Sequence, residues 1–600
     1  MAKKLPKRSE IEEKWTWDLS RIFKNEEELE EAFSQLDEKI AEVSQGKGTL
    51  GDGVLAVKKA TDQLLSLYRS LEVIYVYASM KNDEDTANAK YQALMNRVSG
   101  KYTEAVAAAS YYTPELLSLS DEVLEEYLQA KELQEYHHFL EQTVRSKPHV
   151  LSEKEEALLA QASEIFSASS DTFEVMNNAD FDFGMIQNAE GEEVQLSHGS
   201  YGQLLESTDR NVRKEAFQQL YRVYDQFQHT TASTLSHHVK GHNFSAKVRN
   251  YSSARAASLD SNDIPESVYD TLIEVVHEHL PLLHRYVALR KKLLQVDELH
   301  MYDMYTPLMG EAPLRFSYEE ACKVALEALQ PLGKDYVSVV EKAFQSRWID
   351  VKENAGKRSG AYSSGCYDTD PYILLNWHDS LDQLFTLVHE MGHSMHSYLT
   401  RSHQPYVYGD YSIFLAEIAS TTNENLLTEY LLQTQKDPKV RAYVLNHYLD
   451  GFKGTVFRQT QFAEFEQWIH VTDAKGEPLT SQAMNEYYGD LNQEYYGPAV
   501  EKDPEIALEW SRIPHFYYNF YVYQYATGFA AASALAKNIT EGKEGALEHY
   551  LNFLKAGSSD YPIAVMKKAG VDMTQKDYLE SAFAVFEERL NELEQLVEEL

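Results

Sequence analysis

The sequence predicts a mostly α-helical protein with one or two small β-sheets. Apolar residues recur at intervals of three and four from residue 25 to about residue 172, from 201 to 294, and again after 380. This is the pattern of amphipathic helices. The 600 residues include only 27 glycines and 16 prolines, which favours helices over a turn-rich β architecture.

Two short segments interrupt the helical pattern. Residues 180–198 contain two short runs around an Asn-Ala-Glu-Gly turn, which predicts a β-hairpin. Residues 358–377 begin with small, turn-forming residues and end in an apolar run from Tyr372 to Leu375, which predicts a loop followed by a strand. The hairpin is a natural boundary, so we expect a helical N-terminal domain over 1–199 and a second domain over 200–600.

Composition excludes several classes of protein. A formal net charge of −38 opposes binding to nucleic acid, because a phosphate backbone needs a basic surface. No window approaches the roughly 18 apolar residues of a membrane span, and no apolar segment follows the basic N-terminus as it would in a signal peptide. Cys322 and Cys366 are far apart in sequence, which suits a reducing compartment. We expect a cytoplasmic protein that binds neither membrane nor nucleic acid, and nothing indicates an obligate protein partner.

A helix is predicted over residues 380–400. Ser380 and Gln383 match a capping box at its start. Five apolar residues then share one face at helical spacing, which predicts the side that packs on the core. They are Leu384, Leu387, Val388, Met391 and Met395.

The same helix carries a His-Glu-x-x-His motif. His389 and His393 are four residues apart and project together, the spacing at which two imidazoles can share one tetrahedral zinc. Glu390 lies one residue further round the helix, where it can reach a water held by the metal and act as general base. A chain of this composition is expected to contain at most about 0.1 such motif by chance. The motif therefore predicts a zinc hydrolase.

A catalytic zinc needs a third protein ligand and an open position for water. Two familiar continuations of the motif fail. The elongated metalloprotease motif needs Gly at 396 and His at 399, where this chain has His396 and Leu399. The thermolysin-like motif needs Glu at 412, where it has Ser412. The remaining nearby candidates are His396, Asp410, Glu417 and Glu424.

Glutamates on the next predicted helix, residues 411–432, are better candidates than His396. One helix that supplied His389, His393 and His396 would leave little room for a tetrahedral site, so His396 is expected to support a ligand or to lie in the core. Glu417 lies in an apolar run, where a carboxylate must be paired, protonated or bound to metal. Glu424 follows two turns later on the same face. One glutamate can be the ligand and the other the partner of a histidine; the alternative is an ordinary, partly exposed helix glutamate.

The densest tyrosine stretch of the chain is IPHFYYNFYVYQY, residues 513–525. On a helix that begins near Pro514, four side chains share about a third of the circumference. They are His515, Tyr518, Tyr521 and Tyr525. An aromatic stripe is more often core than chemistry, but hydroxyls and an imidazole on one face can also stabilise an oxyanion and orient substrate carbonyls.

Four segments together resemble the oligoendopeptidase F family, of the thimet oligopeptidase clan: HEMGHSMH, FLAEIAST with Glu424 after it, PYILLNW, and IPHFYYNFYVYQYATG. The resemblance implies an elongated, mostly helical zincin-like metallopeptidase with a small sheet and a deep substrate channel. It implies one Zn²⁺ per chain, with His389, His393 and Glu417 as ligands and Glu390 as general base.

The resemblance also implies roles for other segments. Residues 200–600 would be the catalytic domain, with the metal helix at 380–400, the third-ligand helix at 411–432 and a helix at 514–535 that contacts substrate. That last helix would present His515, Tyr518, Tyr521 and Tyr525, and Tyr525 and Tyr518 are the expected oxyanion contacts. Glu424 and His396 would support the ligands. The thimet branch has a proline shortly after its third-ligand glutamate, whereas this chain has Ile418, Ala419 and Ser420.

The expected function is hydrolysis of internal bonds in short, unstructured oligopeptides. The strand over residues 372–375 is expected to align the substrate by β-pairing, which gives affinity with little sequence selectivity. Two alternatives stay open. A zinc carboxypeptidase of similar helical build would release single C-terminal residues. A non-catalytic helical peptide-binding protein would close its metal site with a fourth protein ligand.

Overall fold

The computed structural model describes residues 4–310 and 314–599. Within these residues the chain is mostly helical with only two small sheets, which confirms the predicted fold class. It forms two compact units, each assembled from three stretches of sequence. The first unit comprises residues 1–150, 315–430 and 535–570, and the second comprises 151–314, 431–534 and 571–600. The chain passes from one unit to the other after residues 150, 314, 430, 534 and 570, and none of these positions is the division expected at residue 199.

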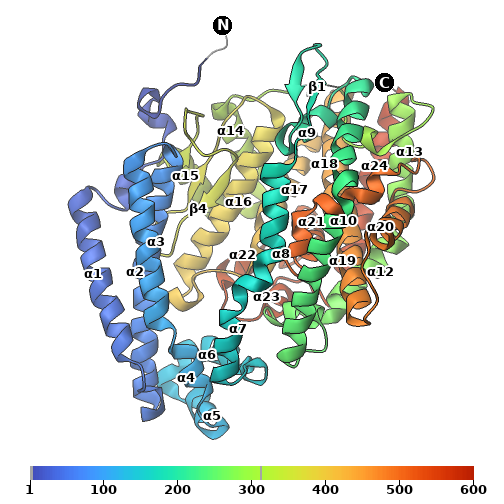
Figure 1. The fold of residues 1–600 in the computed structure, drawn as a ribbon. Helices are drawn as coiled ribbons and strands as arrows, with labels where there is room; N and C mark the ends of the chain where they lie inside the picture. Colours follow the sequence, from blue (N-terminus) through green and yellow to red (C-terminus); the bar gives the residue numbers. More distant parts are fainter. Residues whose placement is uncertain (1–3, 311–313, 600) are drawn as a thin grey trace. The chain divides into compact units, whose positions relative to one another are not determined.

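The first unit contains the long N-terminal helices, of which α1, α2 and α3 run side by side (Figure 1). Asn25 caps α1 by accepting the Glu28 N–H at 2.9 Å, as its sequence position favours. The helices of this unit are α1 (Glu26–Gln45), α2 (Val54–Glu84), α3 (Ala89–Ala109), α4 (Tyr112–Leu117), α5 (Asp121–Gln129), α6 (His137–Arg145), α14 (Tyr318–Ala328), α15 (Lys334–Gln345), α16 (Leu381–His403), most of α17 (Ile413–Thr434), α22 (Ala546–Ala556) and α23 (Pro562–Lys568).

The second unit is built around the 39-residue helix α10. Its described helices are α7 (Glu153–Gln161), α8 (Ser163–Val175), α9 (His198–Leu205), α10 (Arg210–Val248), α11 (Ala254–Asp260), α12 (Glu266–Glu278), α13 (Leu280–Leu294), α18 (Pro438–Phe452), α19 (Arg458–Ala474), α20 (Ser481–Tyr496), most of α21 (Tyr523–Thr540) and α24 (Asp577–Glu599). The predicted hairpin lies here, as strands β1 (Met185–Gln187) and β2 (Glu193–Gln195), which pair antiparallel. No helix in the described ranges is long and apolar enough to cross a membrane.

A three-stranded sheet in the first unit precedes α16. Its strands are β3 (Ile349–Asp350), β4 (Tyr362–Ser364) and β5 (Tyr372–Leu374), in the order β3-β5-β4. The predicted strand is therefore the central one, parallel to β3 and antiparallel to β4. Because β5 is paired on both sides, the expectation that residues 372–375 bind a substrate backbone is wrong.

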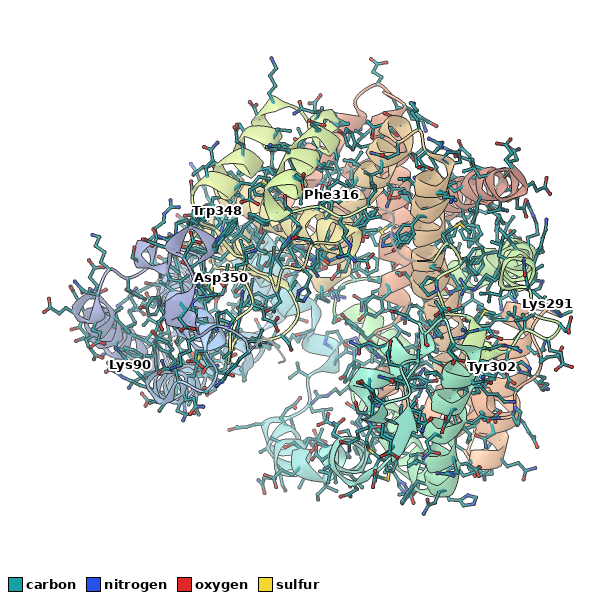
Figure 2. The ribbon with its side chains drawn as sticks, turned by 90° about the horizontal axis from the view of Figure 1, so that it is seen from above. Lys90, Lys291, Tyr302, Phe316, Trp348 and Asp350 are labelled. Atoms are coloured by element: carbon teal, nitrogen blue, oxygen red, sulfur yellow. The ribbon has the colours of Figure 1, made fainter. Side chains whose placement is uncertain are left out.

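The sheet explains why the N-terminal helices and residues 315–430 form one unit. Tyr372 and Leu374 pack with Trp17 and with Met80 of α2 in one apolar cluster. Asp350 of β3, labelled in Figure 2 beside Trp348, is fully buried. An Arg8 nitrogen and the Lys357 ammonium contact the Asp350 carboxylate at 2.8 and 2.7 Å, which compensates the burial of its charge.

Helices α16 and α17 touch backbone to backbone at Gly392. A Cβ atom at Gly392 would lie 2.5 Å from the Ser420 Cα and 2.9 Å from the Ala419 carbonyl oxygen. The contact is fixed further by Asn423, whose Nδ2 donates to the Val388 carbonyl at 3.3 Å. Only glycine permits this approach.

Replacing Gly392 by Ala should therefore separate the two helices and destabilise the first unit. The clash is with backbone rather than with a flexible side chain, so the free energy of unfolding should fall by about 1–3 kcal/mol or more. Denaturant titration measures it. Gly100→Ala is the matched control: Gly100 lies in α3 with open space around the added Cβ, so this change should stabilise by about 0.5–1 kcal/mol. Equal effects of the two substitutions would contradict the contact.

Candidate metal centre and active site

Helix α16 begins where the sequence predicts. Ser380 is its N-cap, and its hydroxyl accepts the Gln383 N–H at 3.1 Å. The predicted return bond is missing, because the Gln383 side-chain oxygen has no hydrogen-bond partner in the described structure; the capping box is only half formed. The predicted core face is buried throughout, with Leu384, Leu387, Val388, Met391 and Met395 all at 0% exposure.

Three ligand atoms converge above this helix. The Nε2 atoms of His389 and His393 are 3.2 Å apart. The Glu417 Oε2 atom lies 3.4 Å from the first and 3.5 Å from the second. Ligand atoms bound at 2.0–2.1 Å to a tetrahedral zinc are about 3.3 Å from one another. The donor set and its spacing therefore fit zinc, and these three residues are the one potential metal-binding group found among the described residues.

Neighbouring side chains orient the three donors. The His389 Nδ1–H donates to the Glu424 carboxylate, which leaves Nε2 as the free lone pair. Burial would lower the pKa of His389, but Glu424 raises it to about 9, so a metal competes with a proton there. The Ser420 hydroxyl donates to the Glu417 Oε2 at 3.1 Å. Burial would raise the pKa of Glu417, but His393 and His389 lower it to about 2.

Glu390 is more buried than the three donors, with 8% of its surface exposed. Burial raises the pKa of its carboxyl group, although His389 and His393 oppose the shift. The Ser363 backbone N–H also faces this carboxylate and lowers its pKa. The proposed base is thus a desolvated carboxyl group beside two imidazoles, whose raised pKa makes it a stronger proton acceptor than an exposed glutamate.

Ser363 lies on the free edge of the sheet, at the centre of β4. On β5 the N–H groups of Ile373 and Leu375 point to β3, so Tyr372 and Leu374 bond to β4. Ser363 pairs with Ile373, and its own N–H and C=O therefore point away from the sheet. Its hydroxyl contacts the Ser394 hydroxyl of α16 at 2.8 Å, which holds this edge against the metal helix.

This edge strand lies in a segment that the sequence predicts to be a loop. Serine has a low preference for strands, and a Tyr-Ser-Ser segment has no apolar alternation. The pairing with β5 is what makes it a strand. The feature of the sequence that could have indicated a strand here is position: the segment lies just before β5, which leads into α16.

The other candidate ligands do not join the cluster. His396 is buried at 1% exposure, stacks on Tyr411 with ring centroids 3.6 Å apart, and has no hydrogen-bond partner on either nitrogen in the described structure. It is a core residue. Asp410 is exposed. The Glu417 side chain is 44% exposed. Its carboxylate lies beside both histidines, so it is paired, one of the three states expected of it.

The tyrosine-rich segment belongs to the second unit and is not one helix. A short 3-10 helix covers Pro514–Tyr517, and α21 starts only at Tyr523. The predicted continuous helix over 514–535 is therefore wrong. Four rings nevertheless cluster: the centroid of His515 lies 5.4, 6.4 and 6.1 Å from those of Tyr518, Tyr521 and Tyr525, and the last two are 5.3 Å apart.

This cluster combines an imidazole of lowered pKa with one exposed and two half-buried tyrosines. Burial lowers the pKa of His515, with a further contribution from the positive charge of Arg458. Tyr518 is 52% exposed, and Tyr521 and Tyr525 are half-buried. The group can donate hydrogen bonds to a carbonyl or an oxyanion.

Comparison with known proteins agrees with a metal-binding role for His389, His393 and Glu417. Residues 203–585 match Peptidase family M3, and residues 115–183 match the family described as Oligopeptidase F. The chain is 56% identical over 591 residues to Group B oligopeptidase PepB of Streptococcus agalactiae, covering 98% of each protein. It is 52% identical over 597 residues to Oligopeptidase PepF of Bacillus subtilis, covering 99% of this chain and 89% of that protein.

A solved structure supports the same assignment. The crystal structure of oligoendopeptidase-F from Enterococcus faecium shares 56% identity and a TM-score of 0.75, covering 96% of this chain and 100% of that one. The family match covers residues 203–585, and the identities exceed one half over nearly the whole chain. Together they identify the family. The protein belongs to peptidase family M3, within its oligoendopeptidase F group, and is a metalloendopeptidase.

Proposed function

We propose that the protein is a zinc-dependent endopeptidase that hydrolyses internal bonds of short, unstructured oligopeptides in the cytoplasm. The observation that carries the proposal is the spacing of 3.2–3.5 Å between the donor atoms of His389, His393 and Glu417, beside the buried Glu390. Zinc bound there supplies a Lewis acid that lowers the pKa of a coordinated water. One ion per chain is expected.

The chain's own residues then carry the proton. Glu390 accepts a proton from the attacking water and returns it to the leaving amine. The rise in its pKa makes Glu390 a better proton acceptor than an ordinary carboxylate. Glu424 holds the His389 ring in the tautomer that presents Nε2. The Ser420 hydroxyl orients Glu417 in the same way.

The edge position of β4 in the sheet supports extended peptides as the substrate class. Ser363 presents its C=O outward and turns its N–H toward Glu390, so an extended peptide that pairs there takes over this N–H and passes the base. Backbone pairing requires an extended segment and depends little on the identity of the substrate side chains. A folded protein has few free extended segments, which restricts cleavage to unstructured peptides.

The cluster of His515, Tyr518, Tyr521 and Tyr525 is the candidate set for contacts to substrate carbonyls and to the oxyanion. A hydroxyl can donate one hydrogen bond to a developing negative charge. Tyr525 and Tyr518 are the first choices for the oxyanion contact.

Two alternatives predict different products. A carboxypeptidase would release single C-terminal residues, whereas an endopeptidase yields two peptides, and mass spectrometry of the products separates them. A binding protein with a structural zinc needs a fourth protein ligand, and the described residues supply three to the cluster. The cytoplasmic location agrees with the two cysteines, Cys322 and Cys366, both of which are free thiols.

Glu390→Gln should keep the metal and the fold but lower kcat by about 10²- to 10⁴-fold, because the amide cannot accept the proton. The measurement is cleavage of an internally quenched peptide, with zinc determined by elemental analysis. Wild-type activity should vanish on chelation and return with added zinc. An active Glu390→Gln enzyme that contains zinc would remove Glu390 as the base.

Glu424→Ala should weaken zinc binding by about 10- to 100-fold, because the His389 ring loses the acceptor that fixes its tautomer. Competition with a chelator of known affinity measures the change. Glu424→Gln is the matched variant: it keeps an oxygen that accepts the Nδ1–H but loses the charge, so its affinity should be intermediate. Wild-type affinity in Glu424→Ala would show that this contact does not orient the ligand.

N-methylation of a peptide substrate should reveal the pairing with β4. An antiparallel peptide exchanges both backbone bonds with Ser363 through a single residue. A methyl group on that residue's nitrogen should lower kcat/KM by about 2- to 10-fold, the equivalent of one hydrogen bond. The two flanking nitrogens point away from the strand and should tolerate methylation. Equal losses at all three positions, or no loss at any, would rule out this pairing.

A further inference from the structure

The turn that joins the two halves of the tyrosine cluster has an unusual backbone. Asn519 and Phe520 have φ angles of 49° and 59°, in the left-handed region. A side chain there crowds the backbone, so residues other than glycine rarely adopt this conformation, and two in succession require the surroundings to hold them. The turn separates His515 and Tyr518 from Tyr521 and Tyr525.

Three helices of the second unit hold this turn through its backbone. The His238 Nε2–H, from α10, donates to the Tyr517 carbonyl at 2.9 Å. The Ser258 hydroxyl, from α11, donates to the Asn519 carbonyl at 2.7 Å. The Glu466 Oε1 atom, from α19, accepts the Phe520 N–H at 2.6 Å. All three side chains bind backbone atoms of residues 517–520, so these three bonds do not involve a tyrosine hydroxyl.

Glu466 is the least expected of the three. It is 0% exposed, and no ion pair of its carboxylate is found within the described ranges. Burial raises its pKa to about 8, so at neutral pH it is a neutral carboxyl group that accepts through its carbonyl oxygen. Burying an acid without a cation is costly. The hydrogen bond that Glu466 accepts from the Phe520 N–H gives this buried acid a structural role.

The Phe520 side chain anchors the turn on the same side. It is 1% exposed and packs on His470 and Tyr269, with ring centroids 4.5 and 5.8 Å away. Tyr518, two residues earlier, is 52% exposed. The turn is thus held by the bond to Glu466 and by the buried Phe520 ring, while Tyr518 beside it stays exposed.

We propose that Glu466 is a positioning residue for the reaction: by accepting the Phe520 N–H, it holds the left-handed turn that sets Tyr521 and Tyr525 against His515 and Tyr518. This inference rests on the proposed role of that cluster in contacting substrate. Glu466 itself touches no substrate. It acts only through the geometry of the turn.

The test compares two replacements of similar size. Glu466→Leu removes the acceptor, whereas Glu466→Gln keeps a neutral oxygen in its place. The leucine variant should lose about 100-fold in kcat, the usual effect of a shift of about 1 Å in catalytic groups, with little change in KM or zinc content. The glutamine variant should restore kcat to within about 3-fold of wild type, because the hydrogen bond is kept.

Hydrogen exchange of the Phe520 amide gives a readout independent of activity. It should be protected in the wild type and in Glu466→Gln, and should exchange at least about 10-fold faster in Glu466→Leu. Glu464→Leu is the matched control on the same helix: its carboxylate contacts His277 and Tyr495 instead, so kcat and the Phe520 amide should be unchanged. If Glu466→Leu does not fold, Ser258→Ala removes another bond from the same turn, at a half-buried position, and should show the same pattern more weakly.

Failure of this inference can be separated from failure of the proposed function. Wild-type kcat and a protected Phe520 amide in Glu466→Leu would overturn the positioning role. In that case a loss of kcat in Tyr518→Phe or Tyr525→Phe would still support the role of the cluster. If both phenylalanine variants keep full activity, the cluster has no part in the reaction, and a slow Glu466→Leu enzyme would then reflect general damage to the second unit.

Discussion

The candidate metal centre depends on one close contact between two helix backbones. Gly392 of α16 meets Ser420 of α17 so closely that a single methyl group would separate them. Two of the proposed ligands, His389 and His393, lie on one helix and the third, Glu417, on the other, so this contact sets the spacing between their donor atoms. Ser420 serves twice, because its backbone forms the contact and its hydroxyl orients Glu417. The second variable residue of the His-Glu-x-x-His motif is therefore a packing residue.

Much of the metal helix could be predicted from sequence because its signals are local. Helical spacing gave the core face of α16, and the motif gave His389, Glu390 and His393. Glu417 was expected to be paired because it lies in an apolar run, and its carboxylate is paired with two imidazoles although its side chain is 44% exposed. The β4 strand was missed because a pair of serines becomes a strand only through its pairing with β5, which no local pattern reports.

The tyrosine segment shows a different limit of sequence reasoning. Helical spacing predicted that four rings cluster, and they do, but no continuous helix produces the cluster. A left-handed turn at Asn519 and Phe520 breaks the helix. That turn is stabilised by His238, Ser258 and Glu466, which lie between about 50 and 280 residues away in sequence. Long-range hydrogen bonds override local propensity here. Long-range packing also explains the boundaries of the units. The three-stranded sheet packs on Trp17 and on α2, which lie about 300 residues earlier in the chain.

The short free edge of β4 has a consequence for self-association. Long, flat strand edges are templates on which other chains assemble into fibrils. Here the edge strand is three residues long, and only Ser363 at its centre presents both backbone groups outward. A strand from another chain could therefore pair with Ser363 alone. So short an edge gives other extended segments little on which to assemble into fibrils.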